Sequence, residues 1–472
     1  MLVLGLGAVI AVLSILQLER ARSGIAIAYV DLADTPATIY RGEAETDLLV
    51  VVSHGFAGSR QMMEAISLTL ANAGHVVVAF DYLGHGRHPR ALSPDIHNLT
   101  GTTEDLVVQT LDVVRAAQKM AGSERVALVG HSMATDVIVR TAARLPEVES
   151  VAAISMYSEA VTPDHPARLL IVSGARESRL REVALTTVEQ FGKAEEGVTV
   201  TRDEGARRAV AAPWVGHVGV LWSSVTSSEI AAWLGPSAEP VRTGPWIAEL
   251  LAAIVAMFWP IAARLPLGLR HQSASLRRAI AAVLVATAVA ALAGLTAVPL
   301  LGYAGFGALA LFLAIWGAVV LAVLRPRLTL DGPGMLAAVM VLIWGLLVFA
   351  LALDRYGAAF LPSGPRLALL AALLPAALVF ALADRILIHG RGLLWAILLR
   401  VPVFGGLLAA MLLNSGGIGM LFTMLPVLVL FLLVYGTMTG WAARRAGPTG
   451  PGLASGVILA WAIAASTPLF SA

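Results

Sequence analysis

The chain of 472 residues is 58% hydrophobic and only 14% charged, whereas a typical soluble protein has roughly 25% charged residues. A net charge of +2, without a basic patch of interleaved aromatic residues, argues against a nucleic-acid partner. The absence of cysteine excludes disulfides, thiolate chemistry and cysteine-ligated metals. The apolar excess is uneven: residues 19–245 have a mixed composition, and residues 246–472 form one apolar stretch after another.

The first segment, residues 1–18, predicts a transmembrane anchor. Its apolar run precedes Glu19, Arg20 and Arg22, and its length is near the minimum for a membrane-spanning helix. A cleaved signal peptide would have a basic start and a small-x-small cleavage site, and neither is clear here. We therefore expect a retained anchor, with a cleaved signal peptide as the alternative.

Residues 25–235 alternate between expected strands and expected helices. Short β-branched apolar runs predict buried strands, and the patterns between them predict helices. The strands are expected at residues 48–53, 76–80, 126–129, 151–155 and 169–172, and the helices near 59–73, 103–120, 133–144, 179–192 and 226–234. This alternation predicts a mostly parallel sheet with helices on both faces, with the active site at the carboxyl ends of the strands.

The strongest local signal lies at residues 126–134, which read Val-Ala-Leu-Val-Gly-His-Ser-Met-Ala. A strand that runs into Gly-x-Ser-x-Ala and then a helix predicts a nucleophile elbow, a turn so sharp that only small residues fit two positions either side of the serine. Ala134 replaces the commoner glycine and is the next smallest residue. We predict that Ser132 is a nucleophile, with an inert serine in a turn as the alternative.

Two upstream segments agree with this interpretation. Residues 53–59 follow a strand, and their glycines let backbone amides face the site. The amide of Phe56, together with that of Met133, is expected to bind an oxyanion. Residues 81–87 follow the next strand. With the elbow, these segments resemble the α/β-hydrolase superfamily in its esterase, lipase and peroxidase-like branches. His54 and His85 are interpreted as structural loop residues.

The resemblance covers about residues 25–235 and implies an eight-stranded sheet and a Ser–acid–His triad that performs acyl transfer. Glu177 follows the strand at 169–172 and stands where the family's acid is presented, so we predict it as the acid. Glu159, which follows the preceding strand, is the alternative acid. His217 is the last histidine before the apolar half and occupies the expected histidine loop, and we predict it as the general base.

Residues 236–245 resemble a linker, and residues 246–472 predict an all-α transmembrane bundle. We expect about eight membrane-spanning helices, each near the ~20 residues that cross a bilayer. Their predicted spans are 246–263, 279–300, 303–324, 335–353, 367–383, 393–413, 418–440 and 453–470. Arg400 lies within the sixth span; it is either a functional group, because charge in a membrane is costly, or a side chain that snorkels to the interface.

Taken together, the odd-numbered loops between these spans hold ten arginines and the even-numbered loops hold two. Arginine marks the cytoplasmic side, so the odd-numbered loops are expected there and the hydrolase domain outside the cytoplasm. Arg20 and Arg22 point the other way. The arginines counted in successive loops are Arg264, Arg270, Arg277 and Arg278 in the first, none in the second, Arg325 and Arg327 in the third, Arg355 and Arg366 in the fourth, Arg385 and Arg391 in the fifth, none in the sixth, and Arg444 and Arg445 in the seventh.

These observations predict a multi-pass protein, in the cell inner membrane, that contacts membrane lipids and hydrolyses an ester or amide of a small-molecule or lipid-like acyl substrate. The gap between residues 155 and 168 leaves no room for a lid, so the pocket should be open. No cofactor and no metal are expected. The alternatives are an acyltransferase that uses the same triad, and a transporter or sensor whose outer domain binds a ligand without catalysis.

Overall fold

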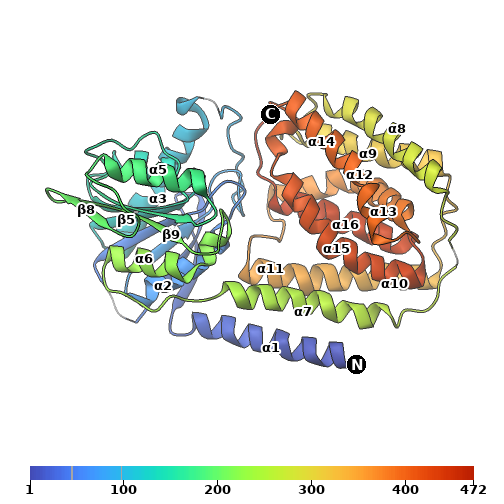
Figure 1. Cartoon of the computed structure of the whole chain (residues 1–472), viewed down its shortest axis with the longest axis horizontal. Coiled ribbons are helices and arrows are strands. Elements are labelled where there is room, and N and C mark those ends of the chain that lie inside the picture. Colours follow the sequence, from blue (N-terminus) through green and yellow to red (C-terminus); the bar gives the residue numbers. More distant parts are fainter. Residues whose placement is uncertain (44–45, 97, 270) are drawn as a thin grey trace. The chain divides into compact units, whose positions relative to one another are not determined.

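The computed structural model describes residues 1–43, 46–96, 98–269 and 271–472. It divides into two compact units (Figure 1). The sheet unit comprises Leu13–Glu249 and Arg355–Ala359, and the helical unit comprises Met1–Val12, Leu250–Asp354 and Phe360–Ala472. Helix α1 (Leu2–Arg22) contributes residues to both units.

A nine-stranded sheet, counted over the described residues, forms the centre of the sheet unit, in the order β1-β2-β4-β3-β5-β6-β7-β9-β8. Strands from β4 to β9 in this order are parallel, and antiparallel pairing is confined to the two edges. The predicted mostly parallel sheet is confirmed. The strands are β1 (Ala26–Leu32), β2 (Thr35–Arg41), β3 (Leu48–Ser53), β4 (Val76–Phe80), β5 (Arg125–His131), β6 (Val148–Ile154), β7 (Arg168–Gly174), β8 (Thr199–Arg202) and β9 (Gly205–Ala212).

The expected count of eight strands is wrong by one. The four residues of β8 form a short antiparallel edge against β9 and alternate between exposed and half-buried positions. A short edge strand with polar side chains does not add to the core, and it limits pairing with other chains. In contrast, every residue of β3 and β4 is buried, because both strands are covered on two faces.

Helices cover both faces of the sheet, with α3 and α5 on one face and α2 and α6 on the other (Figure 1). Helix α3 ends at Gly122, whose φ of 68° provides the left-handed cap that stops a helix. The helices of this unit are η1 (Arg60–Met63), α2 (Glu64–Asn72), η2 (Leu99–Thr103), α3 (Glu104–Ala121), α4 (Met133–Ala142), α5 (Ser178–Glu189), η3 (Gly219–Trp222) and α6 (Ser224–Leu234).

The helical unit consists of apolar helices packed around α16, the most buried of them. Counting α1, nine helical spans within the described residues are long and apolar enough to cross a membrane. From the second span onward they are formed by α7 (Gly244–Ala262), α8 (Leu276–Gly294), α9 (Phe306–Leu324), α10 (Gly332–Leu342) with η4 (Ile343–Phe349) and α11 (Ala350–Tyr356), α12 (Pro365–Ile388), α13 (Leu393–Leu398) with α14 (Val401–Leu413), α15 (Met424–Ala446) and α16 (Thr449–Ser466). The short turn η5 (Ile418–Leu421) precedes α15.

Two of the predicted spans are not uniform helices. The span at 335–353 includes the π-helical segment η4, and the span at 393–413 is interrupted between α13 and α14. Pro402, in the first turn of α14, lacks the amide needed to continue the preceding helix. Arg400 lies at this interruption, and its guanidinium donates two hydrogen bonds of 2.8 and 2.6 Å to Asp384 on α12.

Arg207 on β9 joins the loop after β6 to helix α5. Its side chain is fully buried and donates to the carbonyl oxygens of Thr162, Pro166 and Thr187. The loop at residues 156–167 begins at the carboxyl end of β6. Arg207 pairs with Leu169 near the amino end of β7, so it holds the part of this loop that leads into β7.

Replacing Arg207 with leucine should destabilise the sheet unit by about 2–4 kcal/mol, because buried carbonyl groups lose their donor. The measurement is the thermal unfolding midpoint of the purified full-length protein in detergent. Arg179→Leu is the matched control, because Arg179 is exposed on α5. If both variants unfold at the wild-type temperature, the hydrogen bonds of Arg207 contribute no stability.

Candidate active site

Ser132 lies in a strained turn between β5 and α4. Its φ of 54° and ψ of −117° are unusual for a residue with a side chain, and such a backbone costs about 1–3 kcal/mol. Gly130 is required here: a Cβ at this position would lie 2.9 Å from the side chain of Ile138 and 3.1 Å from the carbonyl oxygen of Ala134. The turn therefore leaves the Ser132 hydroxyl at the carboxyl edge of the sheet, as the sequence predicts.

The structure brings Ser132, His217 and Glu177 together. His217, in the loop after β9, places Nε2 2.8 Å from Ser132 Oγ and Nδ1 2.6 Å from Glu177 Oε1. A neutral imidazole in this position donates from Nδ1 to the carboxylate and accepts the serine hydroxyl at Nε2. The three side chains thus form one hydrogen-bonded chain, although they are far apart in the sequence.

The second oxygen of Glu177 is also hydrogen-bonded. Oε2 accepts from the Ser155 hydroxyl at 2.7 Å and from the Gly174 amide at 2.6 Å. Burial alone raises the pKa of Glu177, but the hydrogen bonds from His217, Ser155 and Gly174 outweigh it and hold the pKa below its ordinary value. Glu177 is therefore a carboxylate at neutral pH.

Glu159 is located elsewhere. Its carboxylate is exposed and accepts a hydrogen bond of 3.3 Å from the Tyr157 hydroxyl. Within the described chain, the carboxylate that bonds His217 is that of Glu177. The geometry therefore favours Glu177 over Glu159 as the partner of the imidazole.

Two residues of the site were not predicted from the sequence. Ser155 follows β6 with φ of 51°, and its hydroxyl holds Glu177. His131, the last residue of β5, lies with Nε2 2.8 Å from the main-chain oxygen of His217. Burial lowers the pKa of His131 to about 4, so its neutral ring donates this bond. Both residues stand at the carboxyl end of a strand, and this position was the available signal.

The loop after β3 lies directly against the elbow. A Cβ on Gly55 would lie 3.0 Å from Ser132 Cβ and 3.1 Å from the main-chain oxygen of His131. Only glycine allows this approach, which brings the adjacent Phe56 close to Ser132. Met133 is the first residue of α4 and follows Ser132 directly. The oxyanion role of the Phe56 and Met133 amides stays a prediction.

His54 and His85 have partners within the loops. His54 Nε2 accepts from the Tyr82 amide at 3.1 Å while Nδ1 lies 2.7 Å from the Gly55 oxygen, and burial lowers the pKa of His54, so the ring is neutral. His85 Nδ1 lies 2.8 Å from the oxygen of Leu83. These contacts fit the structural role that we expected for both histidines.

Three exposed apolar residues lie in the segments that carry the site residues. Trp214, three residues before His217, is 83% exposed, and Val218, directly after it, is 49% exposed. Tyr157 is 54% exposed, and its amide is bonded to Thr135 Oγ1, which also donates to the Ser132 carbonyl oxygen. We call Tyr157, Trp214 and Val218 the apolar rim. His217 itself is about half exposed.

Residues 49–207 match the family model described as alpha/beta hydrolase fold. A serine hydrolase-like protein of Dictyostelium discoideum is 31% identical over 107 residues, which are 23% of this chain and 28% of that protein. The chain thus matches little more than a quarter of this relative's length.

Solved structures that match this chain include an epoxide hydrolase from an endophytic Streptomyces, which is 15% identical in sequence and has a TM-score of 0.34. The match covers 45% of this chain and 96% of that chain. A dienelactone hydrolase from Anabaena variabilis is 17% identical with a TM-score of 0.35, covering 45% of this chain and 97% of that chain. The family match at residues 49–207 and the mostly parallel sheet identify a domain of the α/β-hydrolase family in this chain.

Proposed function

We propose that the chain is a membrane-embedded serine hydrolase that cleaves an ester or amide through an acyl-enzyme intermediate. The observation that carries the proposal is the hydrogen-bonded chain in which His217 joins the Ser132 hydroxyl to the Glu177 carboxylate. This arrangement is suited to general-base activation of a serine, because the imidazole accepts at one nitrogen while the carboxylate fixes the other.

In the proposed reaction, His217 Nε2 takes the Ser132 proton while Oγ attacks the substrate carbonyl carbon. The oxyanion that forms accepts hydrogen bonds from the amides of Phe56 and Met133. The imidazolium, stabilised by ionised Glu177, then protonates the leaving alcohol or amine, and the acyl group remains on Oγ. Water activated by the same imidazole releases the acid and restores the serine.

The apolar rim supports an apolar or lipid-like acyl substrate. Its three exposed apolar residues lie in the segments that follow β6 and carry His217, and an acyl chain would cover such side chains favourably. The connection from β6 to β7 is a loop at residues 156–167 and holds no lid domain. A half-exposed His217 is consistent with an open site that accepts bulky substrates.

The nine apolar spans support membrane embedding of the helical unit. Many large apolar side chains on these helices point outward. Their exposure is unfavourable in water and favourable in the hydrocarbon of a membrane. Examples that are at least 56% exposed are Leu284, Leu292, Leu347, Leu412, Leu430 and Leu433. We propose that these side chains face lipid.

The distribution of charge in the connections supports placing the hydrolase domain outside the cytoplasm, with the chain in the cell inner membrane. The connections at 295–305, 357–364 and 414–423 contain no charged residue. The arginines assigned to the fourth loop lie instead within helices: Arg355 ends α11, and Arg366 in α12 is buried and donates to carbonyl oxygens at the end of α16.

On the other side, Arg277 and Arg278 lie in the first turn of α8 and Arg385 lies in the last turn of α12, so these three arginines are also within helices. Arg264, Arg325, Arg327 and Arg391 lie in the odd-numbered connections, and Arg444 and Arg445 end α15. Arg270 lies outside the described residues. Of the two arginines that oppose this topology, Arg22 is buried and donates to Glu64 at 3.0 Å within the sheet unit, and Arg20 is exposed.

Ser132→Ala should lower hydrolysis by roughly 10⁴-fold or more, because it removes the attacking oxygen. The measurements are turnover of a chromogenic ester and covalent labelling by a fluorophosphonate probe. An unchanged thermal midpoint serves as the folding control. Labelling that persists in the alanine variant means that another residue is the nucleophile.

Glu177→Gln should reduce kcat sharply, on the order of 10³–10⁴-fold, because the amide no longer fixes the imidazole tautomer or stabilises its charge. Glu159→Gln is the matched control and should keep near-wild-type activity, because Glu159 bonds only to Tyr157 in the described chain. Comparable losses in both variants, or a loss only in Glu159→Gln, would show that the acid is wrongly assigned.

The topology is tested by single cysteines, because the chain contains none. Lys193, exposed after α5, and Gln272, exposed between α7 and α8, are replaced separately by cysteine. On intact cells a membrane-impermeant maleimide should label the Lys193→Cys variant and spare Gln272→Cys until the membrane is permeabilised. The opposite pattern places the hydrolase domain in the cytoplasm.

A further inference from the structure

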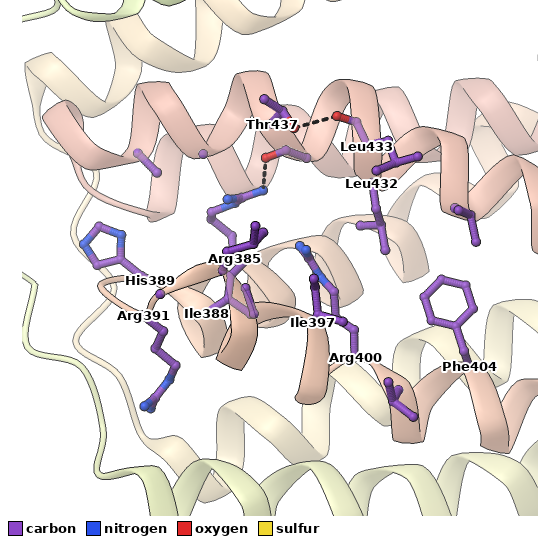
Figure 2. Close-up of a pocket in the computed structure, with 18 of the residues that line it drawn as sticks. Arg385, Ile388, His389, Arg391, Ile397, Arg400, Phe404, Leu432, Leu433 and Thr437 are labelled. Atoms are coloured by element: carbon purple, nitrogen blue, oxygen red, sulfur yellow. Dashed lines mark hydrogen bonds between the residues drawn. The ribbon is translucent and has the colours of Figure 1, made fainter.

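The helical unit contains a cavity of about 1060 Å³ between α12, α13, α14 and α15 (Figure 2). This volume is slightly above the roughly 300–1,000 Å³ usual for small-molecule sites. Much of the lining is apolar and includes Phe404 and Leu408 on α14 and Leu425 and Val429 on α15. None of these residues belongs to the hydrolase site.

Among the described residues, the charged side chains that line the cavity are those of Arg385, Arg391, Arg400 and Arg444. Two of these arginines already have hydrogen-bond partners within the helical unit. Arg400 is neutralised by its two hydrogen bonds to Asp384. Arg391 donates to the main-chain oxygens of Leu387 and Ala274, and in Figure 2 its side chain extends away from α15.

Arg385 is different because its buried guanidinium has no anionic hydrogen-bond partner: the neighbouring Asp384 carboxylate attracts it but is hydrogen-bonded to Arg400. The residue is 5% exposed, and its Nη2 donates only to neutral acceptors, the Gly436 carbonyl at 3.0 Å and the Thr439 hydroxyl at 2.6 Å. Its Nε is buried without a hydrogen-bond partner in the described part of the chain. A buried guanidinium that lacks an anionic partner is strongly unfavourable, so its site favours an anion.

The cavity has a cationic end and an apolar end. Arg444 lies in the last turn of α15 and Arg385 in the last turn of α12, at the ends that carry the arginine-rich connections. Leu425 lies in the first turn of α15, and the helix between Leu425 and Arg444 is about 28 Å long at 1.5 Å per residue. This length is close to the ~30 Å of a bilayer's hydrocarbon core.

We propose that this cavity binds an anionic phospholipid, with its phosphate at Arg385 and Arg444 and an acyl chain along Phe404, Leu408 and Val429. Guanidinium groups bind phosphate through paired, charge-assisted hydrogen bonds. In the proposed topology this end faces the cytoplasmic leaflet, whose surface attracts basic groups through its anionic lipids. The proposal rests on the membrane-spanning assignment and is independent of the hydrolase chemistry.

The test is native mass spectrometry of the full-length protein, purified in detergent and mixed with equal amounts of dioleoyl phosphatidylglycerol and dioleoyl phosphatidylcholine. These probes share their acyl chains and differ in head-group charge. The wild type should retain one phosphatidylglycerol with at least about tenfold preference. Millimolar inorganic phosphate should not displace it, because the acyl chain contributes to binding.

Two variants test the two ends of the cavity. Arg385→Gln should reduce retention of phosphatidylglycerol by about tenfold or more, whereas Arg327→Gln, which removes an exposed arginine from the same side, should not change it. Gly405→Leu should also reduce retention of phosphatidylglycerol, because the leucine side chain would fill part of the cavity that Gly405 lines. The substitution should not disturb the fold, because a Cβ at Gly405 meets no atom within 4 Å. Gly5→Leu is its control, because Gly5 on α1 has equal space and does not line the cavity.

Equal retention of the two lipids would overturn the proposal, as would displacement by inorganic phosphate alone or unchanged retention in Gly405→Leu. If Arg385→Gln does not fold, Gly405→Leu decides. Fluorophosphonate labelling of Ser132 is recorded in parallel and should persist in every variant. A wild type that retains lipid without labelling contradicts the hydrolase proposal alone, and one that labels without retaining lipid contradicts the lipid site alone.

Discussion

At Ser132 the main chain leaves a central parallel strand and enters a helix through a backbone conformation that residues with side chains rarely adopt. The turn persists because β5 is held on both sides by β3 and β6, and because Gly130 and Gly55 leave room for backbone contacts that any side chain would prevent. The strain fixes one hydroxyl at the sheet edge.

The rest of the site depends on this placement, because neighbouring parallel strands end at the same edge. Segments that follow β6, β7 and β9 bring Ser155, Glu177 and His217 to the hydroxyl. Glu177 accepts three hydrogen bonds, and His131 holds the main chain of His217. The imidazole is thus fixed through its ring and through its backbone, which limits the reorganisation needed during proton transfer.

Local signals in the sequence predicted the part of the site that depends on local geometry. Ser132 is marked by small residues at fixed spacing, and Glu177 and His217 by their positions after strands. Ser155 and His131 also stand at the carboxyl ends of strands, but no motif distinguishes them from other residues at those ends. Their importance arises from neighbours that only the folded sheet provides, such as the Glu177 carboxylate and the His217 carbonyl.

Some strands and helix breaks were also missed, because a short stretch of sequence does not show how an element packs in the fold. Strands β3 and β4 coincide with the predicted runs because burial on both faces leaves a continuous apolar signature. Strand β1 is largely exposed, and β9 contains Arg207 and Arg208, so neither has that signature. Apolar composition likewise predicted the long apolar helices but not the π-helical segment η4 or the break between α13 and α14, for which Pro402 was the available signal.

The central claim is that Ser132 carries the acyl group between the two halves of the reaction. Rapid mixing with p-nitrophenyl butyrate, followed by acid quenching and peptide mass spectrometry, tests it directly. A burst of nitrophenol approaching one per chain, with the butyryl group on Ser132, is the predicted result. Product release without a burst and without an adduct, or an adduct on another residue, would contradict the account.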